Sequence, residues 1–208
     1  MPLSIRLDNP ADPEPDRAII DRLLAIIEEQ TSAAGLRAQE VPRASDFPTG
    51  RFLLVQNEAG EYVGMAGSVL PRSDARFSFE RTVGFPHSAL PPSSRTELGE
   101  GLGLYVELAW RRGGLARALT FLSVLLAWDA GAAYFVAENG AVSLNMAVAA
   151  GFTNTGIITN PGAEVPYYLT VGRAEEVLEK AWGSCREPVE ACALSPALRG
   201  VVDRWWNR

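Results

Sequence analysis

The segment from Arg111 to Arg117 combines arginine side chains with a glycine-bearing turn. It reads Arg-Arg-Gly-Gly-Leu-Ala-Arg, and leucines recur at helical spacing at positions 115, 119, 122 and 126. The first amides of a helix lack intrahelical partners, and the helix dipole adds positive potential there, so such an end binds anions. Glycine lets the backbone approach a phosphate closely, and the arginines add charge. The sequence therefore predicts a phosphate-binding turn at the start of a helix.

This turn lies between two predicted strands, 102–108 and 133–137, with a helix that Gly131 ends. Two strands joined by one helix are expected to be parallel neighbours in a right-handed crossover. A Walker loop is excluded because it needs Gly-Lys-Ser/Thr, and the sole lysine is Lys180. The glycine-rich stretch 99–103 comes before a predicted strand, whereas a dinucleotide fingerprint must follow one. The pattern thus indicates a phosphate-bearing ligand without naming it.

The rest of the chain predicts an α/β (α+β) fold with a mixed, mostly antiparallel central sheet and one parallel βαβ crossover. Residues 1–172 are expected to form this domain, and 173–208 a C-terminal helical extension packed on it or at a subunit interface. The link at 71–94 is long enough to suggest a functional segment, with a solvated connector as the alternative. Apolar periodicity and turn residues predict the remaining elements: strands at 3–7, 52–55, 62–70, 76–81, 155–159 and 167–171, and helices at 16–35, 141–150, 174–182 and 196–206.

Composition narrows the classes of function. A net charge of −6 argues against a general nucleic-acid or anionic-membrane surface. No apolar run approaches the roughly 20 residues of a membrane helix, and residues 1–21 carry no secretory pattern, so a cytoplasmic protein is expected. Cys185 and Cys192 are interpreted as reduced thiols. His87 is the only histidine, so no metal site is expected.

With these elements in place, the sequence resembles the GNAT N-acetyltransferase superfamily. The family signature is Arg or Gln, two residues, Gly, one residue, then Gly or Ala, and residues 111–116 fit it. Residues 105–110 look like the strand and bulge that precede it. Downstream, Glu138-Asn139, Ser143 and Gly151-Phe152 are similar to the family's Asn…Gly-Phe segment. The resemblance covers residues 3–171 in element order, but its specific motifs occupy only 100–152.

The resemblance implies a direct transfer of acetyl from acetyl-CoA, as co-substrate, to a primary amine of a small molecule or peptide. The pyrophosphate would lie on the amides of residues 112–116, and the pantetheine arm in a notch where the two parallel strands part. The amide of Val106 or Leu108 would polarise the thioester carbonyl. A homodimer is left open. The expected cofactor-binding residues are Val106, Leu108, Arg111, Arg112, Gly113, Gly114, Leu115, Ala116, Arg117, Asn139 and Ser143.

Candidates for the catalytic base follow from counting. In the histone-acetylating branch, a glutamate eleven residues before the signature acts as base, which here is Glu100. A carboxyl at the start of a largely apolar strand can have a raised pKa, which suits a base near neutral pH. A solvated Glu100, Glu107 and His87 remain alternatives. The chain also departs from the family, because the tyrosine that protonates the leaving thiolate is replaced by Ala147.

Without that tyrosine, Tyr167 or Tyr168 could supply an acid from the other side, or the thiolate could leave unaided. Two other functions stay open. One is an acyl-homoserine-lactone-synthase-like enzyme or N-acyl amino acid synthase with a longer acyl donor, although Gly103 stands where those relatives carry arginine. The other is a non-catalytic CoA-binding module with Trp205 and Trp206 at a partner interface.

Overall fold

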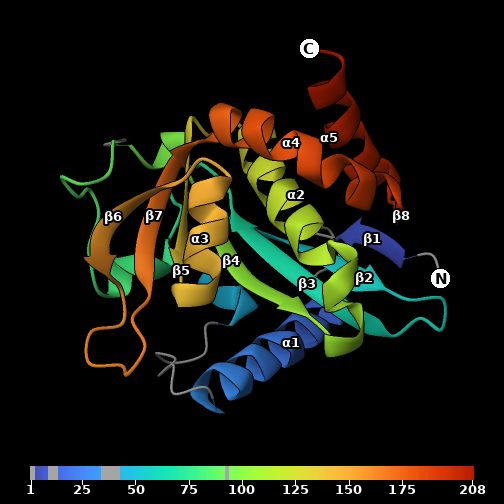
Figure 1. Ribbon diagram of the computed structural model, residues 1–208, viewed down its shortest axis with the longest axis horizontal. Helices are drawn as coiled ribbons and strands as arrows, with labels where there is room; N and C mark the ends of the chain where they lie inside the picture. Colours follow the sequence, from blue (N-terminus) through green and yellow to red (C-terminus); the bar gives the residue numbers. More distant parts are fainter. Residues whose placement is uncertain (1–2, 9–13, 34–42, 92–93) are drawn as a thin grey trace.

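The computed structural model describes residues 3–8, 14–33, 43–91 and 94–208. Within them, eight strands form one sheet in the order β6-β7-β5-β4-β3-β2-β1-β8 (Figure 1). The strands are β1 (Leu3–Leu7), β2 (Gly50–Gln56), β3 (Tyr62–Val69), β4 (Leu98–Val106), β5 (Tyr134–Asn139), β6 (Thr153–Ile158), β7 (Tyr168–Arg173) and β8 (Cys192–Leu194). The helices are α1 (Glu14–Ala33), α2 (Leu115–Asp129), α3 (Ala141–Ala149), α4 (Ala174–Glu190) and α5 (Pro196–Trp206).

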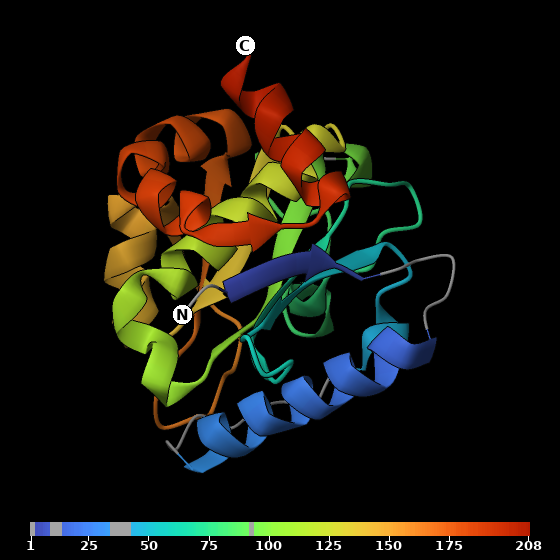
Figure 2. The same cartoon turned by 90° about the vertical axis from the view of Figure 1, so that its right-hand side faces the viewer.

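Helices cover both faces of this sheet. Helices α2, α4 and α5 lie over one face and α1 over the other, as the side view in Figure 2 shows. On the first face, Leu119 and Leu122 of α2 pack in one cluster with Phe135 of β5. On the second face, Leu23 of α1 shares a cluster with Phe52 of β2. Burial on both faces explains why the predicted strand at 52–55 reads as an unbroken apolar run.

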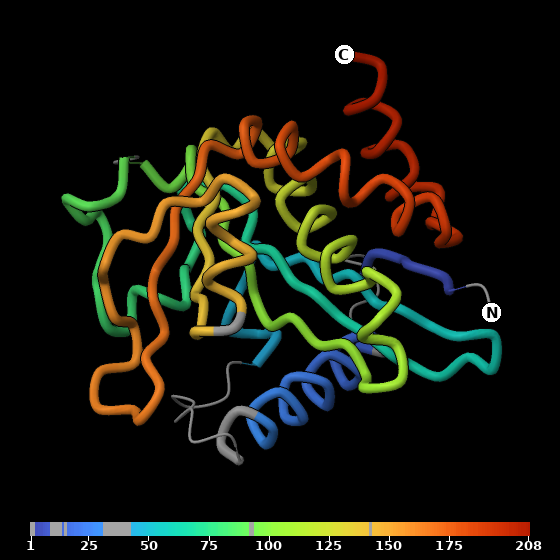
Figure 3. Tube along the Cα trace, in the orientation of Figure 1, coloured from blue at the N-terminus to red at the C-terminus, as the bar shows by residue number. Residues whose placement is uncertain are grey.

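The predicted fold class is confirmed. All pairs between neighbouring strands are antiparallel except β4–β5 and β1–β8, and β4, α2 and β5 form the expected parallel crossover. The tube in Figure 3 also shows the link between β3 and β4 passing beside β6 and β7. Phe79 of this link packs in one cluster with Leu169 and Val171 of β7, so it covers the sheet next to α1.

Two predicted boundaries at the central strand are wrong. Strand β4 begins at Leu98, so the glycine-rich stretch 99–103 lies inside a strand and does not precede one. The helix does not open at Arg111 either. Residues Leu108–Gly113 form a 3₁₀ turn, η4, and α2 starts only at Leu115, after Gly114 adopts a left-handed conformation with φ +77°. The glycines of the stretch 99–103 therefore belong to a strand, where they allow close packing.

Other predictions also need correction. The strand expected at 76–81 is a 3₁₀ turn, η2 (Ser78–Arg81), and a short η3 (Arg95–Glu97) precedes β4. Helix α1 begins at Glu14, so Asp16 lies in its first turn and pairs with Arg6; the predicted stop at Gly35 falls outside the described residues. The break expected after residue 182 is absent from α4, which continues through Gly183 and Pro188 to Glu190.

The last 36 residues contribute both helix and strand. Helix α4 packs across α2, with Val177 and Leu178 in the same buried cluster as Leu119. Strand β8 then pairs with β1 at the edge of the sheet, and the ring of Trp205 in α5 lies 5.1 Å from that of Trp128 in α2. These contacts place α4 directly against the helix that follows the phosphate-binding turn.

Replacing Leu178 with alanine tests this packing. The side chain is fully buried, so truncation should lower the free energy of unfolding by about 2–5 kcal/mol. Urea denaturation followed by tryptophan fluorescence measures the change. The exposed neighbour Glu179→Ala should stay within about 0.5 kcal/mol of wild type. Equal effects of the two substitutions would show that α4 does not depend on this contact.

Candidate functional site

The central feature of the site is a fork between β4 and β5. The two strands pair in parallel only from Leu98↔Tyr134 to Glu100↔Val136, and beyond that point the ladder between them stops. Strand β5 continues along β7 to Asn139, while β4 continues along β3 to Val106. The carboxyl ends of two adjacent strands therefore separate and leave room between them. The family resemblance implied a notch of this kind, where the two parallel strands part.

Glycines in β4 let α2 and the Phe135 ring of β5 approach this strand closely. A Cβ atom on Gly99 would lie 2.5 Å from the Cβ of Ala127, and one on Gly101 would lie 3.2 Å from Cε1 of Phe135. A side chain at Gly99 would collide with α2, and one at Gly101 would crowd the Phe135 ring. These two positions explain why the sequence of β4 alternates glycine with larger residues.

Strand β4 carries a β-bulge just past the fork. Leu102 pairs with Gly67 and Tyr105 with Met65, so Gly103 and Leu104 face the single residue Ala66. Gly103 has φ +39°, a value that favours glycine. A bulge leaves its extra residue outside the ladder. The backbone at Gly103 and Leu104 is consequently the part of β4 that is open to a ligand.

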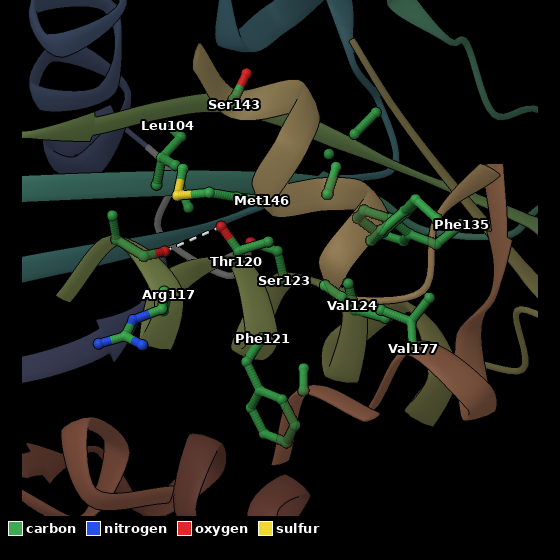
Figure 4. Close-up of a pocket in the computed structure, with 18 of the residues that line it drawn as sticks. Leu104, Arg117, Thr120, Phe121, Ser123, Val124, Phe135, Ser143, Met146 and Val177 are labelled. Atoms are coloured by element: carbon green, nitrogen blue, oxygen red, sulfur yellow. Dashed lines mark hydrogen bonds between the residues drawn. The ribbon is translucent and has the colours of Figure 1, made fainter. Parts of the chain in front are cut away.

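A cavity of about 560 Å³ occupies the fork and continues between α2, α3 and α4. Figure 4 shows side chains from these elements converging on it, including Leu104, Val124, Phe135, Met146 and Val177. Its inner end is apolar, with Val124, Phe135 and Val177 all nearly inaccessible to solvent. Its lining thus suits a ligand with an apolar end.

Polar and cationic groups stand at the outer edge of the same cavity. Arg117 and Thr120 come from α2, and Lys180 and Ser184 from α4; all four are exposed. The Thr120 hydroxyl donates to the carbonyl of Ala116 over 2.9 Å, as drawn in Figure 4. Lys180 lies within the helix expected at 174–182, but no sequence pattern placed that helix beside the site.

The predicted phosphate-binding turn lies at this cationic edge. Ala116 and Arg117 line the cavity, whereas Arg111, Arg112, Gly113, Gly114 and Leu115 do not. Arg111 is engaged within the fold: its Nε donates to the carbonyl of Val106 over 2.8 Å and its Nη2 to Gln30 over 3.2 Å. A Cβ on Gly114 would lie 2.8 Å from Pro188 Cγ, so α4 braces the turn.

The other predicted binding residues lie at different depths. Asn139 is buried at the end of β5, where its Nδ2 donates to Thr170 Oγ1 over 2.8 Å, and Ser143 lies in the first turn of α3; both line the cavity. Val106 and Leu108 do not line it, and Leu108 is 76% exposed. Of this strand, the bulge residues Gly103 and Leu104 line the cavity instead.

Glu100 lies at the fork itself, with its side chain on the face away from α2. It is fully buried, and η2 closes over it: Oε2 accepts from the Ser78 amide over 2.7 Å and Oε1 from the Phe79 amide over 3.3 Å. Burial, and secondarily the charge of Glu138, raise the pKa of Glu100 to about 8 against these stabilising bonds. The predicted base is therefore inside the protein and does not line the cavity.

Glu138 on β5 is a cavity-lining residue that the sequence did not identify as a candidate base, and its carboxyl meets Ser78 of η2. The Ser78 hydroxyl lies 2.5 Å from Glu100 Oε1 and 2.9 Å from Glu138 Oε1, and Thr159 donates to Glu138 Oε2 over 2.8 Å. Burial, and next the charge of Glu138, raise the pKa of Tyr167. The fork thus brings two carboxyls together through one hydroxyl.

The alternative candidate bases lie elsewhere. Glu107 is exposed beyond the end of β4, and His87 accepts a bond from the Ala89 amide in the link; neither lines the cavity. Among the described residues, no group of three His, Cys, Asp or Glu side chains could hold a metal ion. No helix in the described ranges has the length and hydropathy to cross a membrane.

These features match a known fold. The mostly antiparallel sheet, its forked parallel pair and the glycine turn before α2 form the acyl-CoA N-acyltransferase fold, which the chain shares with solved structures of acyl-homoserine lactone synthases and GNAT-family acetyltransferases. No protein-family model and no curated protein sequence matches the chain.

Solved structures give the particular resemblances. The CoA-dependent acyl-homoserine lactone synthase MesI aligns with a TM-score of 0.63 and 16% identity over 92% of this chain and 99% of that one. FeeM, an N-acyl amino acid synthase from uncultured soil microbes, gives 0.60 and 14% over 86% and 94%. An acetyltransferase of the GNAT family from Staphylococcus aureus gives 0.53 and 12% over 83% and 99%.

The buried carboxyl predicts how stability depends on pH. Because the pKa of Glu100 rises from 4.5 to about 8 on folding, the folded chain keeps a proton that the unfolded chain releases between these values. This contribution to stability is complete below pH 4.5 and is lost as the pH rises through about 8. Between these pH values the free energy of unfolding should fall by roughly 1.4 kcal/mol per pH unit, the slope expected when one proton is released.

Denaturation of Glu100→Gln over the same pH range should lack this slope, because glutamine does not titrate. Glu97→Gln, at an exposed position just before β4, serves as the matched control and should keep it. Identical pH profiles for wild type and Glu100→Gln would show that Glu100 is ionised throughout.

Proposed function

We propose that the protein is an N-acyltransferase that moves an acyl group from an acyl-CoA thioester to an amine. The observation that carries this proposal is the continuous cavity that joins the first turn of α2, at Ala116 and Arg117, to the fork beside Glu138. One ligand can then have its phosphates at a helix start and its reactive end beside a carboxyl. The cavity, the helix start and the carboxyl together favour an enzyme over a CoA-binding module.

The phosphate end of the donor is proposed to lie at the first turn of α2. The amides of Leu115, Ala116 and Arg117 precede the first intrahelical donor, Ala118, which bonds to Gly114. Arg117 and Lys180 face this end of the cavity from two helices. The free amides, the helix dipole and the two cations all favour a pyrophosphate.

The thioester is proposed to lie in the fork, beside the bulge of β4. An amide of Gly103 or Leu104 would donate to the carbonyl oxygen as negative charge develops there, in place of the amides of Val106 and Leu108 expected from the sequence. The amine attacks the carbonyl carbon, the C–N bond forms, and the C–S bond breaks when the tetrahedral intermediate collapses. The thiol of CoA and the amide are the products.

The acyl chain is proposed to be longer than acetyl. Beyond the fork, the cavity continues into the apolar space bounded by Phe135, Phe152 and Val177, which an acetyl group would leave empty. Ala147, where the family tyrosine would stand, also borders this space. This supports the longer-chain alternative that the sequence left open over the acetyl donor that it favoured.

A carboxylate at Gly113 tests the site of the phosphates. A Cβ on Gly113 meets nothing within 4 Å, so Gly113→Asp introduces charge without strain, unlike any change at Gly114. It should weaken CoA binding in calorimetry by about tenfold or more, roughly 1.4 kcal/mol, and less at high salt. Gly183→Asp, equally unobstructed but in the middle of α4 and not at the start of α2, is the control. Unchanged binding by Gly113→Asp would place the phosphates elsewhere.

Chain-length dependence tests the acyl site. Each buried methylene contributes about 0.8 kcal/mol, so the dissociation constant should fall by about fourfold per methylene from butyryl-CoA to octanoyl-CoA. Ala181→Phe, in the cavity wall, should abolish the gain, and Ala193→Phe, exposed on β8, should not. Thiol release with a panel of amines then measures transfer. Equal affinity for acetyl-CoA and octanoyl-CoA would support the acetyl donor instead.

A further inference from the structure

The hydroxyl between the two carboxyls of the fork has too few hydrogens for its contacts. Ser78 Oγ lies within hydrogen-bond distance of Glu100 Oε1 and of Glu138 Oε1, at 2.5 and 2.9 Å. A serine hydroxyl has one hydrogen, and an ionised carboxylate can only accept. If both carboxyls were ionised, one of the two contacts would join oxygens with no hydrogen between them. The arrangement therefore requires one further proton on the pair.

The surroundings place that proton on Glu100. Glu100 is fully buried, whereas Glu138 is half-buried and lines the cavity. Of the ion pairs found in the described part of the chain, none involves either carboxyl. A buried carboxyl without a cation is most stable in its neutral form. Glu138 instead accepts from two hydroxyls, those of Ser78 and Thr159, which stabilises the ionised form.

The other titratable groups around the pair do not change this assignment. Tyr167, which precedes β7, interacts with Glu138, and the same charge helps to raise the pKa of its phenol, so it stays neutral. On η2, Glu80 pairs with Arg95 and Arg81 with Asp46. The part of α1 that packs under the sheet presents the apolar Leu23 and Leu24.

We propose that Glu138 exchanges protons with the reacting groups, while Glu100 acts on it through Ser78 as a neutral positioning residue. This inference rests on the proposed acyl transfer. The resting chain runs from the Glu100 carboxylic acid, which donates to Ser78, to the Ser78 hydroxyl, which donates to the Glu138 carboxylate. Glu138 is catalytic because it borders the ligand cavity, and Glu100 never meets the substrate.

The proton balance closes on Glu138 alone. As the amine nitrogen attacks the thioester carbon, it loses a proton to the Glu138 carboxylate, and the pair then holds two protons. When the C–S bond breaks, the sulfur takes that proton from Glu138 and leaves as the thiol, and the pair returns to one. A single group thus serves as base and then as acid, which accounts for the absence of a tyrosine at Ala147.

Conservative variants separate the two carboxyls. Glu138→Gln should lower kcat with octanoyl-CoA by about 10²–10⁴-fold and leave the dissociation constant for octanoyl-CoA within threefold. Glu100→Gln replaces a neutral acid by a neutral amide that can also donate to Ser78, so kcat should stay within about tenfold. Glu100→Leu cannot donate a hydrogen bond to Ser78, so its kcat should fall well below that of Glu100→Gln. Glu97→Gln is the control.

If Glu100 were the base that contacts the amine, Glu100→Gln would lose as much activity as Glu138→Gln, and the proposal would be wrong. A wild-type protein that binds octanoyl-CoA but transfers nothing to any amine would contradict the proposed function instead. The two failures are therefore distinguishable.

A measurement without substrate tests the proton itself. Carbon-13 NMR of glutamate side-chain carboxyls in the free protein, assigned with the two glutamine variants, should show Glu100 protonated and Glu138 ionised at pH 7. Ser78→Ala should alter the titration of the Glu100 signal. An ionised Glu100 at pH 7, or a protonated Glu138, would overturn the proposal whether or not an acceptor amine has been found.

Discussion

The short parallel pairing between β4 and β5 is the constraint on which the site depends. Three residues of each strand form the ladder, and the strands then follow different neighbours, β4 along β3 and β5 along β7. The separation opens the cavity on the side of α2 and leaves Glu100 and Glu138 near one another on the opposite face. If the ladder ran two residues further, it would close the gap through which a thioester on one side could reach a carboxyl on the other.

The link between β3 and β4 completes the site from below the sheet. Its η2 turn directs two amides and a hydroxyl at Glu100, and a cluster of aromatic rings packs around the turn. The rings of Phe77 and Phe79 stack at 5.5 Å, and the Arg95 guanidinium lies over Phe77 at 5.6 Å while it pairs with Glu80. Burying a carboxyl is costly, and this rigid packing keeps its compensating donors aligned.

The sequence predicted the fold well where the pattern was local. Apolar periodicity identified α2 and α5, and the strand–helix–strand order identified the parallel crossover, because each depends on neighbouring residues alone. The sequence analysis placed the start of β4 wrongly. The glycines of this strand are set by close contacts with Ala127 and Phe135, which lie far away in the chain. The same limit applies to the site. Counting found Glu100, but no local signal links Ser78 to Glu138, and only the fold brings them together.

The alanine at position 147 bears both on the size of the proposed donor and on the way in which its thiol would be protonated. Ala147 lines the cavity, so a tyrosine there would fill part of the space available to an acyl chain. A chain that accommodates a longer donor at this position gives up the usual acid. The carboxyl pair at the fork is the acid that we propose instead, because Glu138 lines the cavity from β5. A neutral Glu100 is then the condition that lets Glu138 serve both as base and as acid.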